Sequence, residues 1–175
     1  MFKNFLILAM LVLVLSSLAK EKQKEAVLEI SDSTYPSTKV VYDWNLQSPE
    51  AVNQALNYIS NHLKAYSEYS PFEEVEIVVV SHGPEVAIFV KDNFEKFKDV
   101  IARMKSFNKG YGIKFYVCYN AIRALGYSKE DVLPFVILTP AGVAKLAVLQ
   151  DQGYRLVPAI VHDFKKIKEK YGRKK

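Results

Sequence analysis

Cys118 is the single cysteine of the chain, and it ends an apolar segment, residues 113–118, that is typical of a buried strand. A cysteine thiolate is the nucleophile that attacks disulfides and persulfide sulfur. A helix is expected to begin just after Cys118. The unpaired N–H groups of a helix start carry partial positive charge and would stabilise that thiolate. Cys118 is therefore a candidate reactive group, and the alternative is a cysteine that only fills the core.

Further polar or sterically special residues follow the ends of the other predicted strands. In parallel sheets the functional groups gather beyond the carboxyl ends of the strands. We therefore expect these residues to lie along the same edge as Cys118. They are Asp43, Trp44, His82, Gly83, Asn120, Pro140, Ala141 and Gly142.

Several other chemistries are excluded by the residue pattern. One cysteine cannot form an intramolecular disulfide framework, a CxxC pair or a cysteine-rich zinc site. The histidines at 62, 82 and 162 lack metal-ligand spacing, and His62 is expected to face water. The GxG at 110–112 precedes a strand instead of following one, so it does not fit a dinucleotide site. We predict neither a metal nor a cofactor.

The elements that must position these residues alternate along the chain. Apolar and β-branched runs predict strands over residues 39–44, 75–81, 113–118, 135–138 and 154–157. Helical spacing predicts helices that begin at Ser48-Pro49, near Phe94, at Asn120 and after Thr139-Pro140, the last with Val143, Leu146 and Leu149 on its inner face. Residues 85–90 fit a helix or a strand equally well. Five strands separated by helices predict an α/β domain with a mostly parallel sheet covered on both faces.

The two ends of the chain differ from this body. Residues 1–19 combine Lys3, an apolar run from Phe5 to Leu15 and small residues before Ala19, which is the layout of a signal peptide. We therefore expect export to the periplasm with cleavage after Ala19; the alternative is an uncleaved anchor that leaves the domain on the same side. Residues 20–38 are expected to be an exposed lead-in.

The net charge of +5 is concentrated at the C-terminus. Residues 163–175 hold seven Lys or Arg and two Asp or Glu, so residues 20–162 are nearly neutral. No basic stripe interleaved with aromatic residues is present, and we predict no nucleic-acid partner. Residues 159–175 are interpreted as a solvated basic tail, with attraction to a membrane surface as the alternative.

Three segments together resemble the DsrE/DsrF-like family, which includes the YchN-type proteins. They are HGPEVAIF (82–89), KFYVCYNAIRALGYSKEDVLP (114–134) and TPAGVAKLAVLQDQGYRLVP (139–158). The likeness covers residues 39–158, which we take as the domain, and this chain would be an exported member. It implies a three-layer α/β/α sandwich around a five-stranded sheet, assembled as trimers or hexamers.

The resemblance also implies a chemistry, because the best understood relatives carry sulfur as a cysteine persulfide. By position, Cys118 matches the family cysteine, and His82 and Asn120 match its polar neighbours. Gly83 belongs to the His-Gly turn, and residues 140–142 match the loop that closes the same edge. We therefore expect a sulfur carrier or sulfur-relay protein in which Cys118 accepts sulfane sulfur. Backbone N–H groups of residues 119–121 would stabilise the anion, and the partner would be a sulfur donor or acceptor.

Two other functions fit the same residues. A non-catalytic oligomeric module could bind a small ligand at this edge, with Cys118 as packing. A rhodanese-like sulfurtransferase is the second alternative, because Cys118 and Arg123 match a C-x4-R spacing. The intervening residues, YNAI, lack the glycine usual in such anion-binding loops, so Arg123 is expected on the exposed side of a short helix.

Overall fold

The computed structural model describes residues 26, 28–29, 35–162 and 164–173. The fold described below belongs to the unit Ser31–Lys175. The predicted signal peptide, residues 1–19, lies outside the described residues, as does most of the lead-in at 20–38. Among the described helices, none is long and apolar enough to cross a bilayer.

One five-stranded sheet organises the described domain, in the order β4-β3-β2-β1-β5. Every neighbouring pair of strands is parallel, so the predicted parallel sheet is confirmed. The strands are β1 Thr38–Trp44, β2 Val75–Ser81, β3 Lys114–Cys118, β4 Ile137–Thr139 and β5 Arg155–Pro158.

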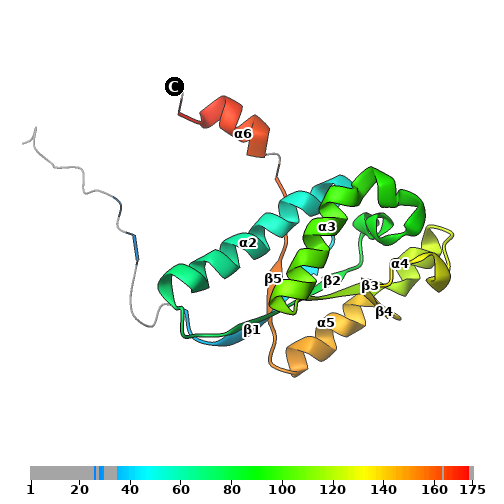
Figure 1. Cartoon of the computed structure of the whole chain (residues 1–175), viewed down its shortest axis with the longest axis horizontal. Helices are drawn as coiled ribbons and strands as arrows, with labels where there is room; N and C mark the ends of the chain where they lie inside the picture. Colours follow the sequence, from blue (N-terminus) through cyan, green and yellow to red (C-terminus); the bar gives the residue numbers. More distant parts are fainter. Residues whose placement is uncertain (1–25, 27, 30–34, 163, 174–175) are drawn as a thin grey trace, which may run out of the picture. The chain divides into compact units, whose positions relative to one another are not determined.

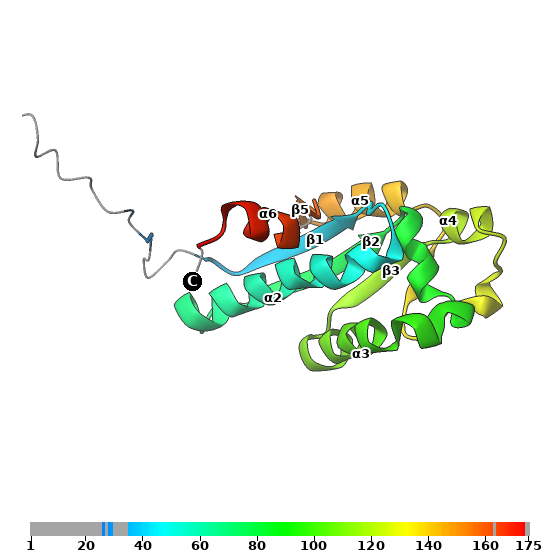
Figure 2. The same cartoon turned by 90° about the horizontal axis from the view of Figure 1, so that it is seen from above.

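The helices within residues 52–151 cover the two faces of this sheet, which gives the three layers of an α/β/α sandwich (Figure 1). The chain moves across the sheet from β1 to β4 in one direction and then returns to place β5 beside β1. Because crossovers are right-handed, this reversal puts α5 on the face opposite α2 and α3, as Figure 2 shows. The helices are α2 Val52–Tyr69, α3 Phe94–Tyr111, α4 Tyr119–Ala124, α5 Gly142–Asp151 and α6 Phe164–Tyr171.

The two faces have separate apolar clusters. On the α2 and α3 face, Trp44, Phe89 and Phe115 belong to one large cluster of buried side chains. The buried side chains on the α5 face are far fewer: Val41, Val78, Val80, Leu146 and Leu149. Side chains alternate along each strand, so residues two apart in β1 or β2 reach the same face.

Several predicted boundaries shift in the structure. The fourth strand begins at Ile137 and ends at Thr139, and α5 begins at Gly142 with no side-chain cap from Thr139. Val143 was predicted on the inner face of that helix, but it is 65% exposed because Leu146 and Leu149 face the sheet. The ambiguous segment forms a short 3-10 helix, Pro84–Phe89.

His62 also differs from the prediction. It was expected to face water, but its side chain is half-buried and its Nδ1 lies 2.9 Å from the hydroxyl of Tyr42. Burial lowers the pKa of His62, because the charged imidazolium loses solvation.

Candidate functional site

Asp43, His82 and Cys118 come together on the α5 face of the sheet. Asp43 follows Val41 by two residues and His82 follows Val80 by two, and both valines are buried on that face. Ser81 pairs with Val117, so His82, one residue further, stands level with Cys118 on the neighbouring strand. Neighbouring strands lie about 4.8 Å apart. The structure therefore brings three of the predicted site residues to one place.

The site lies at a topological switch point of the sheet. Cys118 pairs with Thr139, so β3 and β4 end side by side. The chain leaves β3 into α4, whose Ile122 joins the α2 and α3 cluster, whereas it leaves β4 into α5 on the other face. Where connections part in this way, a crevice opens beyond the carboxyl ends of the strands, and open α/β sheets bind ligands there.

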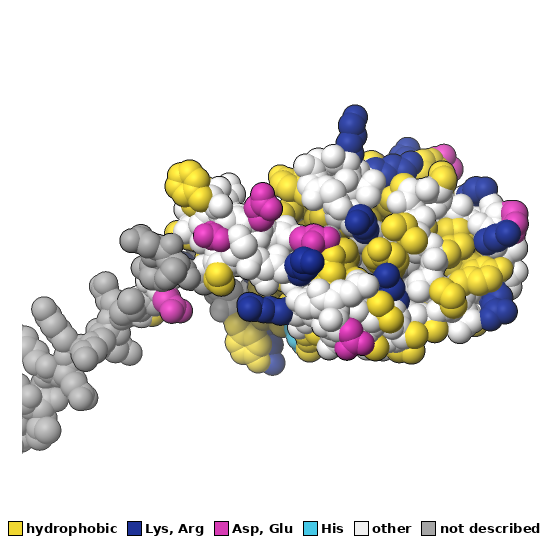
Figure 3. All heavy atoms as spheres, turned by 90° about the horizontal axis from the view of Figure 1, so that it is seen from below, with side chains coloured by type: hydrophobic (Ala, Val, Ile, Leu, Met, Phe, Trp, Pro, Cys, Tyr) yellow, Lys and Arg dark blue, Asp and Glu magenta, His cyan; other side chains and the backbone are white. Residues whose placement is uncertain are grey.

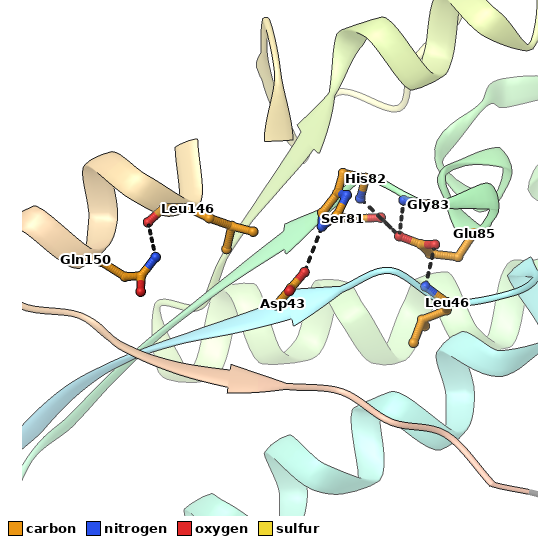
Figure 4. A network of polar contacts seen from close by, with 8 residues as sticks. All are labelled: Asp43, Leu46, Ser81, His82, Gly83, Glu85, Leu146 and Gln150. Carbon is orange, nitrogen blue, oxygen red and sulfur yellow. Dashed lines mark hydrogen bonds and ion pairs between the residues drawn. The ribbon is translucent and has the colours of Figure 1, made fainter. Parts of the chain in front are cut away.

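His82 is oriented by Asp43. The Nε2 atom of His82 lies 2.7 Å from Oδ1 of Asp43, and both side chains are largely but not completely buried, at 14% and 25% exposed (Figure 4). A carboxylate accepts a hydrogen bond from Nε2–H, which leaves Nδ1 with a free lone pair. A nucleophile beside a base that is oriented by a third group is the arrangement of nucleophilic catalysis.

Gly142 closes the site from the start of α5. A Cβ atom at this position would lie 2.4 Å from Cβ of His82 and 3.4 Å from Cβ of Cys118. The backbone of α5 therefore approaches both side chains so closely that only glycine fits. Of the other predicted loop residues, Ala141 is half-buried and Pro140 is exposed.

Glu85 anchors the turn that carries His82, and sequence reasoning missed it. The side chain is completely buried. Its Oε1 accepts hydrogen bonds from Ser81 Oγ and from the backbone N–H groups of His82 and Gly83. Its Oε2 accepts one from Leu46 N–H, so one carboxylate joins the loops after β1 and β2 (Figure 4). The signal in the sequence was a charged residue inside the largely apolar stretch 82–90, which indicates a buried carboxylate with hydrogen-bond partners.

The electrostatics of Glu85 follow from these contacts. Burial raises the pKa of Glu85, and the hydrogen bonds from Ser81 and the backbone oppose that rise because they favour the carboxylate. Gly83 belongs to this network because its N–H donates to Glu85. A side chain would not fit there, since a Cβ at this position would lie 2.5 Å from Oε2 of Glu85. We assign Gly83 to positioning of the turn.

Trp44 was predicted as a ligand-binding residue, and the structure places it elsewhere. Its side chain is 0% exposed and packs against Phe115 in the α2 and α3 cluster. Strand alternation explains the correction, because Asp43 and Trp44 are consecutive and must point to opposite faces.

Asn120 and Arg123 interact on the surface of α4. Asn120 is exposed, and its Oδ1 accepts a hydrogen bond from Arg123, whose guanidinium stacks over Tyr119. The backbone N–H of Asn120 donates to the carbonyl of Pro140, so it is not free to stabilise an anion as predicted. Residues 119–124 form a helix rather than an anion-binding loop, which leaves the rhodanese interpretation without structural support.

Cys118 itself is 7% exposed. Lys145, one turn into α5, lies 4.2 Å from the ring centroid of Tyr116, the residue two before Cys118 on the same strand. A cation therefore stands on the α5 face near the site. Within the described part of the chain, no group of three or more His, Cys, Asp or Glu side chains is arranged to hold a metal ion.

Comparisons with known proteins agree with this fold. A search of curated proteins found no match. A solved structure from Methanobacterium thermoautotrophicum, the protein of unknown function MTH1491, superposes with a TM-score of 0.53 at 24% identity, and the alignment covers 70% of this chain and 99% of that one. The model of the DsrE/DsrF-like family matches residues 46–158, which include His82, Cys118 and Gly142. The chain belongs to the DsrE/DsrF-like family.

Proposed function

We propose that this protein is a sulfur carrier that holds sulfane sulfur as a persulfide on Cys118. The observation that carries the proposal is the position of Cys118 beside the Asp43–His82 pair, at the edge where β3 and β4 part. The DsrE/DsrF-like family is associated with sulfur relay, which supports the same chemistry.

The proposed loading step needs no oxidant. His82 Nδ1 accepts the proton of the Cys118 thiol, while Asp43 accepts a hydrogen bond from the other ring nitrogen and stabilises the imidazolium. The thiolate attacks the outer sulfur of a donor R–S–SH, so that a new S–S bond forms on Cys118 and the donor's S–S bond breaks. The proton on His82 then passes to the departing thiolate. The products are Cys118–S–SH and R–SH.

The local charge supports an anionic donor. Lys145 stands over Tyr116 on the same face, and it would act on a negative charge in the group R of the donor, because the outer sulfur is protonated when the thiolate attacks it. Lys145 would therefore attract the donor to the site. Asn120, whose side chain is held by Arg123 on the surface of α4, is not assigned to the reacting sulfur.

Intact mass spectrometry after incubation with inorganic polysulfide tests this proposal. We expect a +32 Da species in the native chain and none in Cys118→Ser, with circular dichroism verifying that both are folded. Serine is nearly isosteric with cysteine, so the substitution removes the thiol with little change of volume. A +32 Da species in Cys118→Ser would contradict the assignment.

The low exposure of Cys118 favours a second candidate function, a binding module in which the thiol only packs. Iodoacetamide labelling of the folded protein at neutral pH separates the two. The carrier proposal expects Cys118 to be labelled without denaturant, and the binding module expects labelling only after unfolding.

Export and assembly complete the proposal. We propose that residues 1–19 are removed on export to the periplasm, which the mass of the mature N-terminus tests. We propose assembly into trimers or hexamers, because apolar side chains are exposed on the α5 face, among them Val143, Val148 and Leu156 at 43–65%. Light scattering of the purified protein gives the number of subunits.

A further inference from the structure

The C-terminal helix α6 carries an apolar stripe that nothing in the described structure covers. Phe164, Ile167 and Tyr171 recur at intervals of three and four residues, which places them on one side of the helix. They are 69%, 44% and 73% exposed, and no residue of α6 is buried. Ile160, just before the helix, is also exposed. α6 follows β5 at the end of the chain (Figure 1).

Basic side chains surround this stripe. Residues 163–175 carry seven Lys or Arg and two Asp or Glu, whereas the preceding domain is nearly neutral. Lys170 lies 5.0 Å from the ring centroid of Tyr171, so a cation stands directly at the border of the apolar stripe. Figure 3 shows other hydrophobic side chains at the surface of the molecule between single basic ones, whereas the sequence of the tail combines an apolar stripe with a net charge of +5 over residues 163–175.

We propose that α6 is an interfacial helix that docks this domain on an anionic lipid surface. Phe164, Ile167 and Tyr171 would enter the boundary between headgroups and acyl chains, and the lysines would contact the anionic headgroups. Long lysine side chains reach past an apolar surface to place their charge in the headgroup layer. The observation that favours lipid over a protein groove is charge complementarity, because an excess of five positive charges needs a densely anionic partner. This inference does not depend on the sulfur chemistry of Cys118.

Cosedimentation with vesicles tests the proposal. Binding to vesicles of phosphatidylglycerol and phosphatidylcholine is compared with binding to vesicles of phosphatidylcholine alone. The native chain and all variants begin at the same residue, the mature N-terminus that mass spectrometry identifies. The lysine variant is Lys165→Gln, Lys168→Gln and Lys170→Gln together. We expect the partition coefficient onto anionic vesicles to fall about 100-fold, since each lysine near the surface is worth about fivefold. Raising the salt concentration should weaken binding of the native chain.

Matched controls separate the tail from the body. Lys98→Gln, Lys109→Gln and Lys114→Gln change the net charge equally at exposed positions of the domain and should leave binding within about twofold. Phe164→Ser with Ile167→Ser should weaken binding, while Phe72→Ser, at a 97% exposed position, should not. Three results would overturn the proposal. The native chain could bind neutral and anionic vesicles equally, or the two lysine variants could lose the same amount of vesicle binding. The number of subunits could also change when the apolar stripe is altered.

Discussion

The two faces of the sheet are built for different purposes. On one face, α2 and α3 cover a continuous cluster that includes Trp44, Phe89 and Phe115, all 0% exposed. On the other, Leu146 and Leu149 of α5 cover three buried strand valines, and the polar pair Asp43–His82 lies beside them with Cys118. The first face therefore supplies most of the apolar burial, and the second carries the groups that can react.

This division explains how a small domain keeps polar groups at its sheet edge. Polar side chains that leave water contribute little net stability, because the loss of hydration opposes the hydrogen bond between them. The α5 face can tolerate Asp43 and His82 because the opposite face stabilises the fold. Changes on the first face should therefore alter stability most, and changes on the second should alter the site.

The largest expected effect is on the α2 and α3 face. Phe115 is completely buried between Trp44 and Phe135. We expect Phe115→Ala to lower the free energy of unfolding by about 3–5 kcal/mol, because it removes a buried ring and leaves a cavity. Urea denaturation measures the change. Phe72→Ala, at an exposed site, should change the free energy of unfolding by less than about 0.5 kcal/mol. Equal losses of stability in the two variants would contradict the view that the α2 and α3 face stabilises the fold.

Gly142 tests how tightly α5 closes the reactive face. We expect Gly142→Ala to cost about 1–3 kcal/mol, because the new Cβ would overlap Cβ of His82, which the backbone holds in place. The same variant should slow persulfide formation, since His82 must move. Gly110→Ala is the matched control: it lies inside α3 with nothing within 4 Å and should stabilise by up to about 1 kcal/mol. A harmless Gly142→Ala would mean that α5 does not lie this close.

Glu85 joins the loops after β1 and β2, which lie at the edge that carries the site. In Glu85→Gln, an amide N–H₂ would have to replace one carboxylate oxygen, and each oxygen accepts backbone or hydroxyl hydrogen bonds. We expect a loss of about 1–3 kcal/mol, because a buried donor is left unpaired. Chemical denaturation, with exposed Glu95→Gln as the control, measures it. If both variants unfold alike, Glu85 does not hold the turn.

The smallest expected effect concerns the pH dependence of His62 on the α2 side. Burial lowers the pKa of His62, whose Nδ1 lies 2.9 Å from the Tyr42 hydroxyl. The unfolded chain therefore binds the proton more tightly than the folded one. As the pH falls below about 6.5, the contribution of His62 to the free energy of unfolding should decrease. Denaturation at several pH values should show this decrease of the free energy of unfolding in the native chain and in His162→Gln, and a smaller decrease in His62→Gln.

The sequence predicted the parallel sheet and the edge that carries the site, because apolar runs and chain order carry that information. Asp43, His82, Cys118 and Gly142 were all placed at the correct edge. Trp44 was misassigned because its position at the end of a strand does not determine which face its side chain occupies. The alternation of side chains along the strand, which can be read from the sequence, places it on the face opposite Asp43. Val143 was misassigned because each step of three residues turns a helical side chain by about 60° away from the previous one, so that Val143 falls outside the side that Leu146 and Leu149 turn to the sheet.

Other features could not be derived from one sequence. The position of β5 beside β1 depends on which long-range pairing buries the most surface, and local pattern does not encode that choice. The role of Glu85 depends on four donors, three of them backbone groups, that only the folded turn assembles. Whether a helix residue such as Tyr171 is covered or exposed also depends on the finished surface.

The central claim is that Asp43 and His82 activate Cys118 toward sulfane sulfur. Its most direct test is the rate of the +32 Da adduct on Cys118 with inorganic polysulfide in the native chain and in His82→Gln. The account predicts that His82→Gln reacts about 100-fold more slowly at neutral pH, because a positioned general base contributes at least that factor. An equal rate in the two proteins would contradict it.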